Sequence, residues 1–199
     1  NSYPDSIHAD GTISPSTCQH TSFLAILYDI IEKKNHAAAL NNVLNKPDDM
    51  VGIGSPFALL YLYEMMDKEG LQDKIIESIY HDFEEMLRLG ATTVWEQLRD
   101  TRSHCHAWSS SPIYFLNRII LGVRQSEPGG TAFEISPMPN GLDWAGGAVA
   151  TPYGPLQVQW ELSGRTLKVQ VDAPKGVEVS FKRNKTLKGL KPEVEIKRR

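Results

Sequence analysis

Hydrophobic residues recur at helical spacing through roughly the first 120 positions of the chain. The clearest case is 71–89, where apolar side chains fall three and four positions apart and the opposite face is charged. The segment 56–70 is apolar around most of its circumference, which indicates a helix packed on several sides. Ser14 and a capping box at Ser16–Gln19 favour a helix start at Pro15. The further predicted helices run from Pro15 to about Lys34, from His36 to Leu44 and from Ser111 to Gly122.

Beyond about residue 124 the spacing becomes alternating, which is typical of β-strands. Residues 126–130, Ser-Glu-Pro-Gly-Gly, are interpreted as a linker, and we place a domain boundary there, dividing the chain into 1–125 and 126–199. Strands separated by Gly and Pro turns predict a small antiparallel β-sandwich after this boundary. The predicted strands are 133–135, 143–151, 156–161, 166–171 and 177–181, with a hairpin turn at 163–165.

Charge is unevenly distributed along the chain. Residues 182–199 hold eight Lys or Arg and two Glu, which gives +6, so the remainder must carry −9 to reach the net charge of −3. A basic segment can bind nucleic acid or an anionic surface. This one lacks interleaved aromatic residues, so a solvated end of a β-domain is the better interpretation. No stretch is long and apolar enough to span a membrane. We therefore expect neither a nucleic acid nor a membrane as partner.

The cysteines and the first residue bear on compartment and processing. Cys18 and Cys105 have neither metal-ligand nor redox spacing, so they do not indicate a compartment, and a disulfide between them is not favoured. No signal peptide opens the chain, and the localisation stays unknown. Because the chain opens on Asn rather than Met, we expect a fragment or a processed product.

The stretch with the most chemistry follows the helix predicted at 71–89. Residues 89–97 read Leu-Gly-Ala-Thr-Thr-Val-Trp-Glu-Gln, and 103–109 read Ser-His-Cys-His-Ala-Trp-Ser. Aromatic rings can stack on the apolar face of a sugar, and a carboxylate beside them can act as acid or base on a glycosidic bond. From the residues alone, a single Glu after a Trp is most often a surface or helix-start residue, and Trp95 could simply belong to the core.

The stretch Gly-Ala-Thr-Thr-Val-Trp-Glu closely resembles the Gly-Ala-Thr-Thr-x-Trp-Glu motif of the α-L-rhamnosidases of glycoside hydrolase family 78. Residues 105–108, Cys-His-Ala-Trp, match that family's Asn-His-Tyr-Ala segment as a variant. Further similarities, such as Gly-Ser-Pro-Phe at 54–57, extend over most of residues 10–180. The resemblance implies an α + β two-domain chain, in which part of an (α/α)6 barrel is followed by the β-sandwich.

The resemblance also implies roles for individual side chains. Glu96 would be the general base of an inverting hydrolysis of terminal α-L-rhamnosides, and a rhamnose-containing glycan or glycoside would be the ligand. Trp95 would form a wall of the sugar pocket, His106 would hydrogen-bond sugar hydroxyls, and Trp108 would also contact the substrate. The family's general acid lies in an upstream acidic cluster, and nothing before Glu96 matches it. We therefore expect the C-terminal part of a longer enzyme, inactive without the chain upstream.

Other interpretations stay open at this point. Successive ligands in His104-Cys105-His106 rarely close a metal site, so we expect neither metal nor cofactor. A serine hydrolase is disfavoured because no Gly-x-Ser-x-Gly motif is present. The alternative functions are a non-catalytic carbohydrate-binding or interaction module and an (α/α)6 glycosidase for a different sugar. The first is supported by Trp144 and Trp160, although we expect both to lie in the core.

Overall fold

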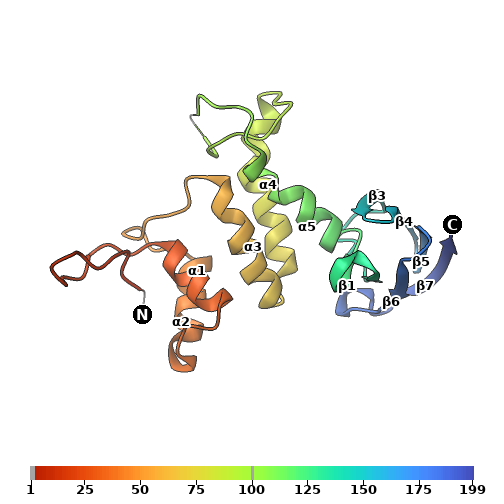
Figure 1. Ribbon diagram of the computed structural model, residues 1–199, viewed down its shortest axis with the longest axis horizontal. Helices are drawn as coiled ribbons and strands as arrows, with labels where there is room; N and C mark the ends of the chain where they lie inside the picture. Colours follow the sequence, from red (N-terminus) through yellow and green to blue (C-terminus); the bar gives the residue numbers. More distant parts are fainter. Residues whose placement is uncertain (1–2, 100) are drawn as a thin grey trace. The chain divides into compact units, whose positions relative to one another are not determined.

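The computed structural model describes residues 3–99 and 101–199. The chain forms two compact units, Asn1–Pro112 and Ile113–Arg199. The first is helical and the second is built mainly from β-strands, which confirms the predicted α + β class (Figure 1). The predicted domain boundary near residue 125 stays a prediction. The division between the two compact units, at residues 112 and 113, describes contacts within this chain and does not test it.

The helical unit contains α-helices joined by turns and by longer loops, and α1 contacts both α2 and α3. The helix predicted at 71–89 is confirmed as α4, and the one at 56–70 as a 3-10 turn leading into α3. The helices are α1 (Gln19–Leu27), α2 (Lys33–Leu44), η1 (Pro56–Ala58), α3 (Leu59–Lys68), α4 (Gln72–Arg88) and η2 (Ala107–Ser109). No helix in the described part of the chain has the length and hydropathy needed to cross a membrane.

The first helix is shorter than its apolar pattern predicts. We expected it to run from Pro15 to about Lys34, but α1 ends at Leu27 and Asp29 has a φ of 56°. The ammonium of Lys68 donates to the carbonyl oxygens of Ile26 and Leu27 and pairs with the Asp29 carboxylate at 2.7 Å. A helix end leaves its last carbonyls without intrahelical partners. Here the Ile26 carbonyl also accepts from the Asp29 backbone N–H at 3.2 Å, so a local turn and a distant side chain together end the helix.

Gln19 lies at the start of α1 but does not form the predicted capping box. Its side-chain nitrogen donates to the Val43 carbonyl at 3.0 Å, and its side-chain oxygen accepts from the Ile53 backbone N–H at 3.2 Å. The backbone N–H of Gln19 donates to the Val51 carbonyl at 2.9 Å. One side chain thus joins α1, the end of α2 and the segment that leads to η1.

The boundary between the two units falls in the first turn of α5 (Ser111–Ile119), and the second unit continues as two sheets. The small sheet has strand order β1-β2-β6, and the large sheet has order β3-β4-β5-β7. Pairing is mainly antiparallel, but β6 joins β2 and β7 joins β5 in parallel. The strands are β1 (Val123–Glu127), β2 (Ala132–Ile135), β3 (Trp144–Thr151), β4 (Gly154–Ser163), β5 (Thr166–Ala173), β6 (Glu178–Phe181) and β7 (Lys191–Arg198), with 3-10 turns η3 (Pro128–Gly130) and η4 (Lys185–Leu187).

The predicted sandwich is confirmed, but its edges differ from the prediction. The segment interpreted as a linker, residues 126–130, begins inside β1, which pairs with β2 from Val123 to Glu127. The linker prediction is therefore wrong for residues 126 and 127. The basic segment contains β7, a strand that the alternation analysis missed. Both strands are largely polar, with few buried positions, so their hydrophobic signal is weak.

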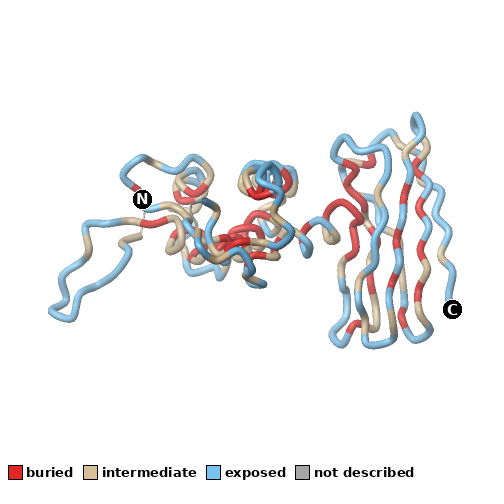
Figure 2. Tube along the Cα trace, turned by 90° about the horizontal axis from the view of Figure 1, so that it is seen from above, coloured by how far each residue is buried: buried red, intermediate tan, exposed pale blue. Residues whose placement is uncertain are grey.

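Side chains alternate between buried and exposed along β4 and β5, the two central strands of the large sheet (Figure 2). This is the pattern of a sheet with one face in the core and one in solvent. Trp160 is buried as predicted, and its indole N–H donates to the Ile120 carbonyl at 2.9 Å. The core prediction for Trp144 is wrong, because this residue is 71% exposed. The other inward side chains of β4 and β5 are Leu156, Val158, Leu167, Val169 and Val171.

Candidate active site

The loop that follows α4 places Glu96. Gly90 adopts a φ of 73° and ends the helix, as predicted. The backbone N–H of Glu96 donates to the Ser103 carbonyl at 3.0 Å, and its carbonyl accepts from the Ser55 hydroxyl at 2.9 Å. The backbone N–H of His106 donates to the Val94 carbonyl at 2.9 Å. The two arms of the loop therefore run side by side, with the backbone of Glu96 held on both sides.

This backbone arrangement brings Glu96 and His106 together. The His106 Nε2 atom lies 3.9 Å from a carboxylate oxygen of Glu96, beyond direct hydrogen-bonding distance. The His106 Nδ1 atom is 2.9 Å from the Ser103 hydroxyl. The Glu96 side chain is 42% exposed, while that of His106 is only 20% exposed. A solvent-accessible carboxylate thus lies beside an imidazole that is oriented by its hydrogen bond to Ser103.

Aromatic rings extend this cluster. The Trp108 ring lies 4.5 Å from the His106 ring, centroid to centroid, and Trp108 is 50% exposed. Phe57 meets Trp108 edge to face at 6.2 Å and meets Tyr61 at 5.8 Å. The sequence does not reveal that Phe57 and Tyr61 lie beside Trp108, since only tertiary contacts connect them to the loop. An exposed aromatic surface next to polar groups is suited to stacking on a sugar ring.

Trp95 takes a different position from its neighbours. It is buried, and its indole stacks on the His104 ring at 4.5 Å and 20°. The His104 carbonyl accepts from the Thr93 hydroxyl, and His104 Nε2 lies 3.1 Å from the Thr101 carbonyl. These contacts stabilise the base of the loop. The role of Trp95 as a wall of the sugar pocket stays a prediction.

The cysteine and histidine cluster was also considered as a metal site. Cys18 is a buried free thiol and Cys105 is an exposed one. Within the described residues, no group of His, Cys, Asp and Glu side chains is placed to hold a metal ion. The chemistry available at this loop is that of a carboxylate, an imidazole and aromatic rings.

Two family models match nearly the whole chain. The six-hairpin glycosidase domain of bacterial α-L-rhamnosidases matches residues 6–120. The C-terminal domain of the same enzymes matches residues 122–194. The chain belongs to the bacterial α-L-rhamnosidase family. The six-hairpin match confirms that the helices are part of an (α/α)6 barrel.

Relatives of the family support this assignment. The chain is 35% identical to the GH78 family rhamnosidase of Bacillus sp. GL1, with a TM-score of 0.89 over 100% of this chain and 22% of that one. It is 23% identical to a curated α-L-rhamnosidase of Formosa agariphila, over 86% of this chain and 21% of that protein. The α-L-rhamnosidase of Aspergillus terreus shares the fold at 22% identity, with a TM-score of 0.65 over 88% of this chain and 22% of that one. The chain thus spans about one-fifth of the length of these relatives.

The hydrogen bond between Ser103 and His106 gives a first prediction. If His106 has the substrate-binding role that the family resemblance implies, Ser103→Ala should lower kcat/KM for an aryl α-L-rhamnoside about two- to tenfold in a longer enzyme that contains this sequence, because one neutral hydrogen bond contributes about 0.5–1.5 kcal/mol. Ser103→Thr keeps the hydroxyl and should restore most of the activity. Equal losses in both variants would show that the hydroxyl does not orient the imidazole.

Proposed function

We propose that this chain supplies the general-base side of the active site of an inverting α-L-rhamnosidase. The observation that carries the proposal is the exposed Glu96 carboxylate 3.9 Å from His106 Nε2, on a loop whose backbone is hydrogen-bonded on both sides. In an inverting hydrolysis, a carboxylate takes a proton from the attacking water while a carboxylic acid protonates the leaving oxygen. Glu96 performs the first of these steps.

The neighbours of Glu96 bind the sugar in this proposal. His106 Nε2 hydrogen-bonds a hydroxyl of the rhamnose ring, while Nδ1 stays with Ser103. Trp108 stacks on the apolar side of the ring, which in a 6-deoxy sugar includes the C5 methyl group. Trp95 stabilises the loop by stacking on His104, and it stays a candidate for a wall of the sugar pocket.

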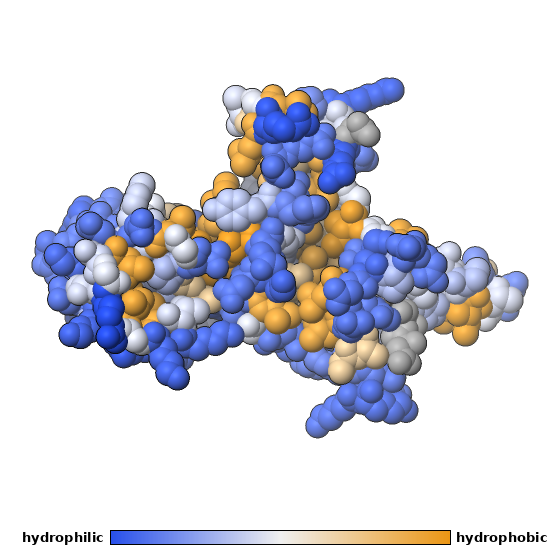
Figure 3. Space-filling view, turned by 180° about the vertical axis from the view of Figure 1, so that it is seen from behind, coloured by the Kyte–Doolittle hydropathy of each residue, from blue (hydrophilic) through white to orange (hydrophobic). Residues whose placement is uncertain are grey.

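The general acid is proposed to come from another part of a longer enzyme. In an inverting site the two carboxyl groups stand about 6.5–9.5 Å apart, so that a water fits between them and the sugar. The helices also carry large apolar side chains on their surface, such as Tyr80 and Leu87 on α4, and hydrophobic areas are visible on the face shown in Figure 3. Such surface favours packing against further chain, so we infer that the pocket is completed there.

The second prediction tests this proposal directly. The isolated chain should not hydrolyse an aryl α-L-rhamnoside, because a single carboxylate cannot supply acid and base together. The enzyme that contains the sequence should release β-L-rhamnose first, and proton NMR of the anomeric signals reports this. Turnover by the isolated chain, or the α-anomer as first product, would contradict the proposal. A panel of other aryl glycosides separates it from an (α/α)6 glycosidase for a different sugar.

A further inference from the structure

We propose that the outer face of the large sheet is a second carbohydrate site, which binds a neutral oligosaccharide. The outer face consists of the outward side chains of β3, β4, β5 and β7. The strand register arranges them in rows across the sheet. The rows are Trp144–Glu161–Lys168–Glu193, Gly146–Gln159–Gln170–Glu195 and Ala148–Gln157–Asp172–Lys197.

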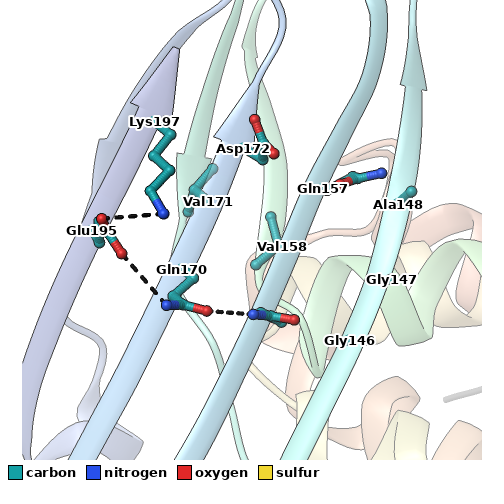
Figure 4. Close-up of a pocket in the computed structure, with 11 residues that line it drawn as sticks. Gly146, Gly147, Ala148, Gln157, Val158, Gln170, Val171, Asp172, Glu195 and Lys197 are labelled. Atoms are coloured by element: carbon teal, nitrogen blue, oxygen red, sulfur yellow. Dashed lines mark hydrogen bonds and ion pairs between the residues drawn. The ribbon is translucent and has the colours of Figure 1, made fainter. Parts of the chain in front are cut away.

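The outer face is hollowed along β3. That strand presents Gly146 and Ala148 where its neighbour β4 presents Gln159 and Gln157. Small residues beside long ones leave a shallow hollow of 450 Å³, seen in Figure 4. A second hollow of 560 Å³ reaches Trp144 and shares Gly146, Gln159 and Gln170 with the first. The two hollows adjoin at these three residues, and together they are called the groove.

Trp144 stands at one end of this groove. Its position two residues before Gly146 puts the indole on the outer face, and it is 71% exposed. A single exposed apolar residue is common on protein surfaces. Here, however, the indole lines the same hollow as Gly146, which has no side chain, so a ring lying on the indole can extend over Gly146. Stacking on an indole is the contact that an apolar sugar face requires.

Polar side chains along the groove are oriented by one another. The Gln159 side-chain nitrogen donates to the Gln170 side-chain oxygen, and the Gln170 nitrogen donates to Glu195 at 3.4 Å (Figure 4). Lys197 pairs with Glu195 at 3.3 Å. Each amide has a second N–H and an acceptor oxygen with spare lone pairs. The row therefore offers donors and acceptors in a fixed order, as neighbouring sugar hydroxyls require.

The charges on the outer face balance. It carries four carboxylates, at Glu161, Asp172, Glu193 and Glu195, against the lysines at 168, 191 and 197. Arg199, which pairs with Asp172, brings the sum to zero. The face therefore has no net positive charge to attract an anionic ligand such as a sulfated glycan, a nucleic acid or an acidic lipid surface. The central row holds two amides beside a glycine, which suits uncharged hydroxyl groups.

The test follows the indole resonance of Trp144 in the full 199-residue chain by NMR. The probes are maltohexaose, xylohexaose, mannohexaose and a linear α-L-rhamnan oligosaccharide, with a heparin hexasaccharide as the anionic comparison. We expect a saturable shift with at least one neutral probe and none with heparin. No saturable shift with any neutral probe, or a shift with heparin alone, would overturn the proposal.

Variants locate the binding on the outer face. Trp144→Ala removes the indole reporter, so its binding is measured by isothermal titration calorimetry beside the unchanged chain, and it should be about tenfold weaker or more, as loss of a central Trp contact implies. Gly146→Thr fills the groove, and it should fold because a Cβ there meets Gln159 only at an ordinary 3.6 Å. Tyr80→Ala, which removes an exposed aromatic elsewhere, should leave binding unchanged. Glu96→Gln should also leave it unchanged, which separates this site from the proposed active site. Binding that survives both Trp144→Ala and Gly146→Thr would contradict the assignment.

Discussion

Replacing Glu96 with Gln should lower kcat for an aryl α-L-rhamnoside about 10³-fold in the enzyme that contains this sequence, with KM changed little. General acid–base catalysis typically contributes 10²–10⁴-fold. An amide cannot take a proton from the attacking water, but it has nearly the shape of the carboxylate it replaces. The backbone bonds of Glu96 to Ser103 and Ser55 do not involve the side chain, so the loop should keep its conformation. Steady-state kinetics of purified enzyme measures both constants.

A matched control is available in the same helical unit. Glu69 also pairs with a histidine, His36, at 3.2 Å, but it lies at the end of α3 and not on the Glu96 loop. Glu69→Gln changes a half-buried carboxylate–imidazole contact and should leave kcat within about twofold, because this pair does not lie on the loop that carries Glu96 and His106. A loss below tenfold for Glu96→Gln, or equal losses in the two variants, would remove Glu96 as the base.

Local patterns in the sequence predict the elements that carry their own signal. The helix α4 has a charged outer face and a regular apolar stripe, and β4 and β5 alternate cleanly. Where a boundary depends on a distant group, the pattern misleads. The end of α1 is an example, because Ile30 continues the apolar spacing but lies exposed beyond the break that Lys68 caps. The hydrophobic pattern does not predict β7, because the side chains of this strand are mostly charged. The strand forms by backbone pairing with β5.

The candidate site shows the same division. The resemblance around Trp95 and Glu96 points to the loop, and the structure then brings Glu96 and His106 within 3.9 Å. It does not reveal that Ser103 orients the imidazole or that Phe57 meets Trp108, since both depend on how the chain folds back. For Trp144, the alternation of the strand could have predicted an exposed position. Residues two apart share a face of a strand, so Trp144 belongs with Gly146 and Ala148, outside the core.

The largest effect on stability is expected from Gly122→Ala. Gly122 joins α5 to β1 with a φ of 73°, and its carbonyl accepts from the Ser136 backbone N–H at 2.8 Å. A Cβ at this position would lie 2.2 Å from the Ser136 carbonyl carbon and 2.3 Å from the Pro137 nitrogen. Left-handed backbone costs a non-glycine residue about 1–2 kcal/mol, and overpacking adds about 1–3 kcal/mol. We therefore expect a loss of about 3 kcal/mol or more in the free energy of unfolding, measured by urea denaturation with circular dichroism.

Gly129→Ala separates the two causes of this loss. Gly129 has a similar φ of 80°, but a Cβ there would meet nothing within 4 Å. In this variant the left-handed backbone is unfavourable but no steric clash arises. We therefore expect the free energy of unfolding to fall by only about 1–2 kcal/mol. Faster hydrogen exchange in β1 and β2 should accompany Gly122→Ala, because the clash separates the end of α5 from the segment that follows β2. Equal losses in the two glycine variants would mean that Ser136 and Pro137 move aside easily, and the close approach would then not limit stability.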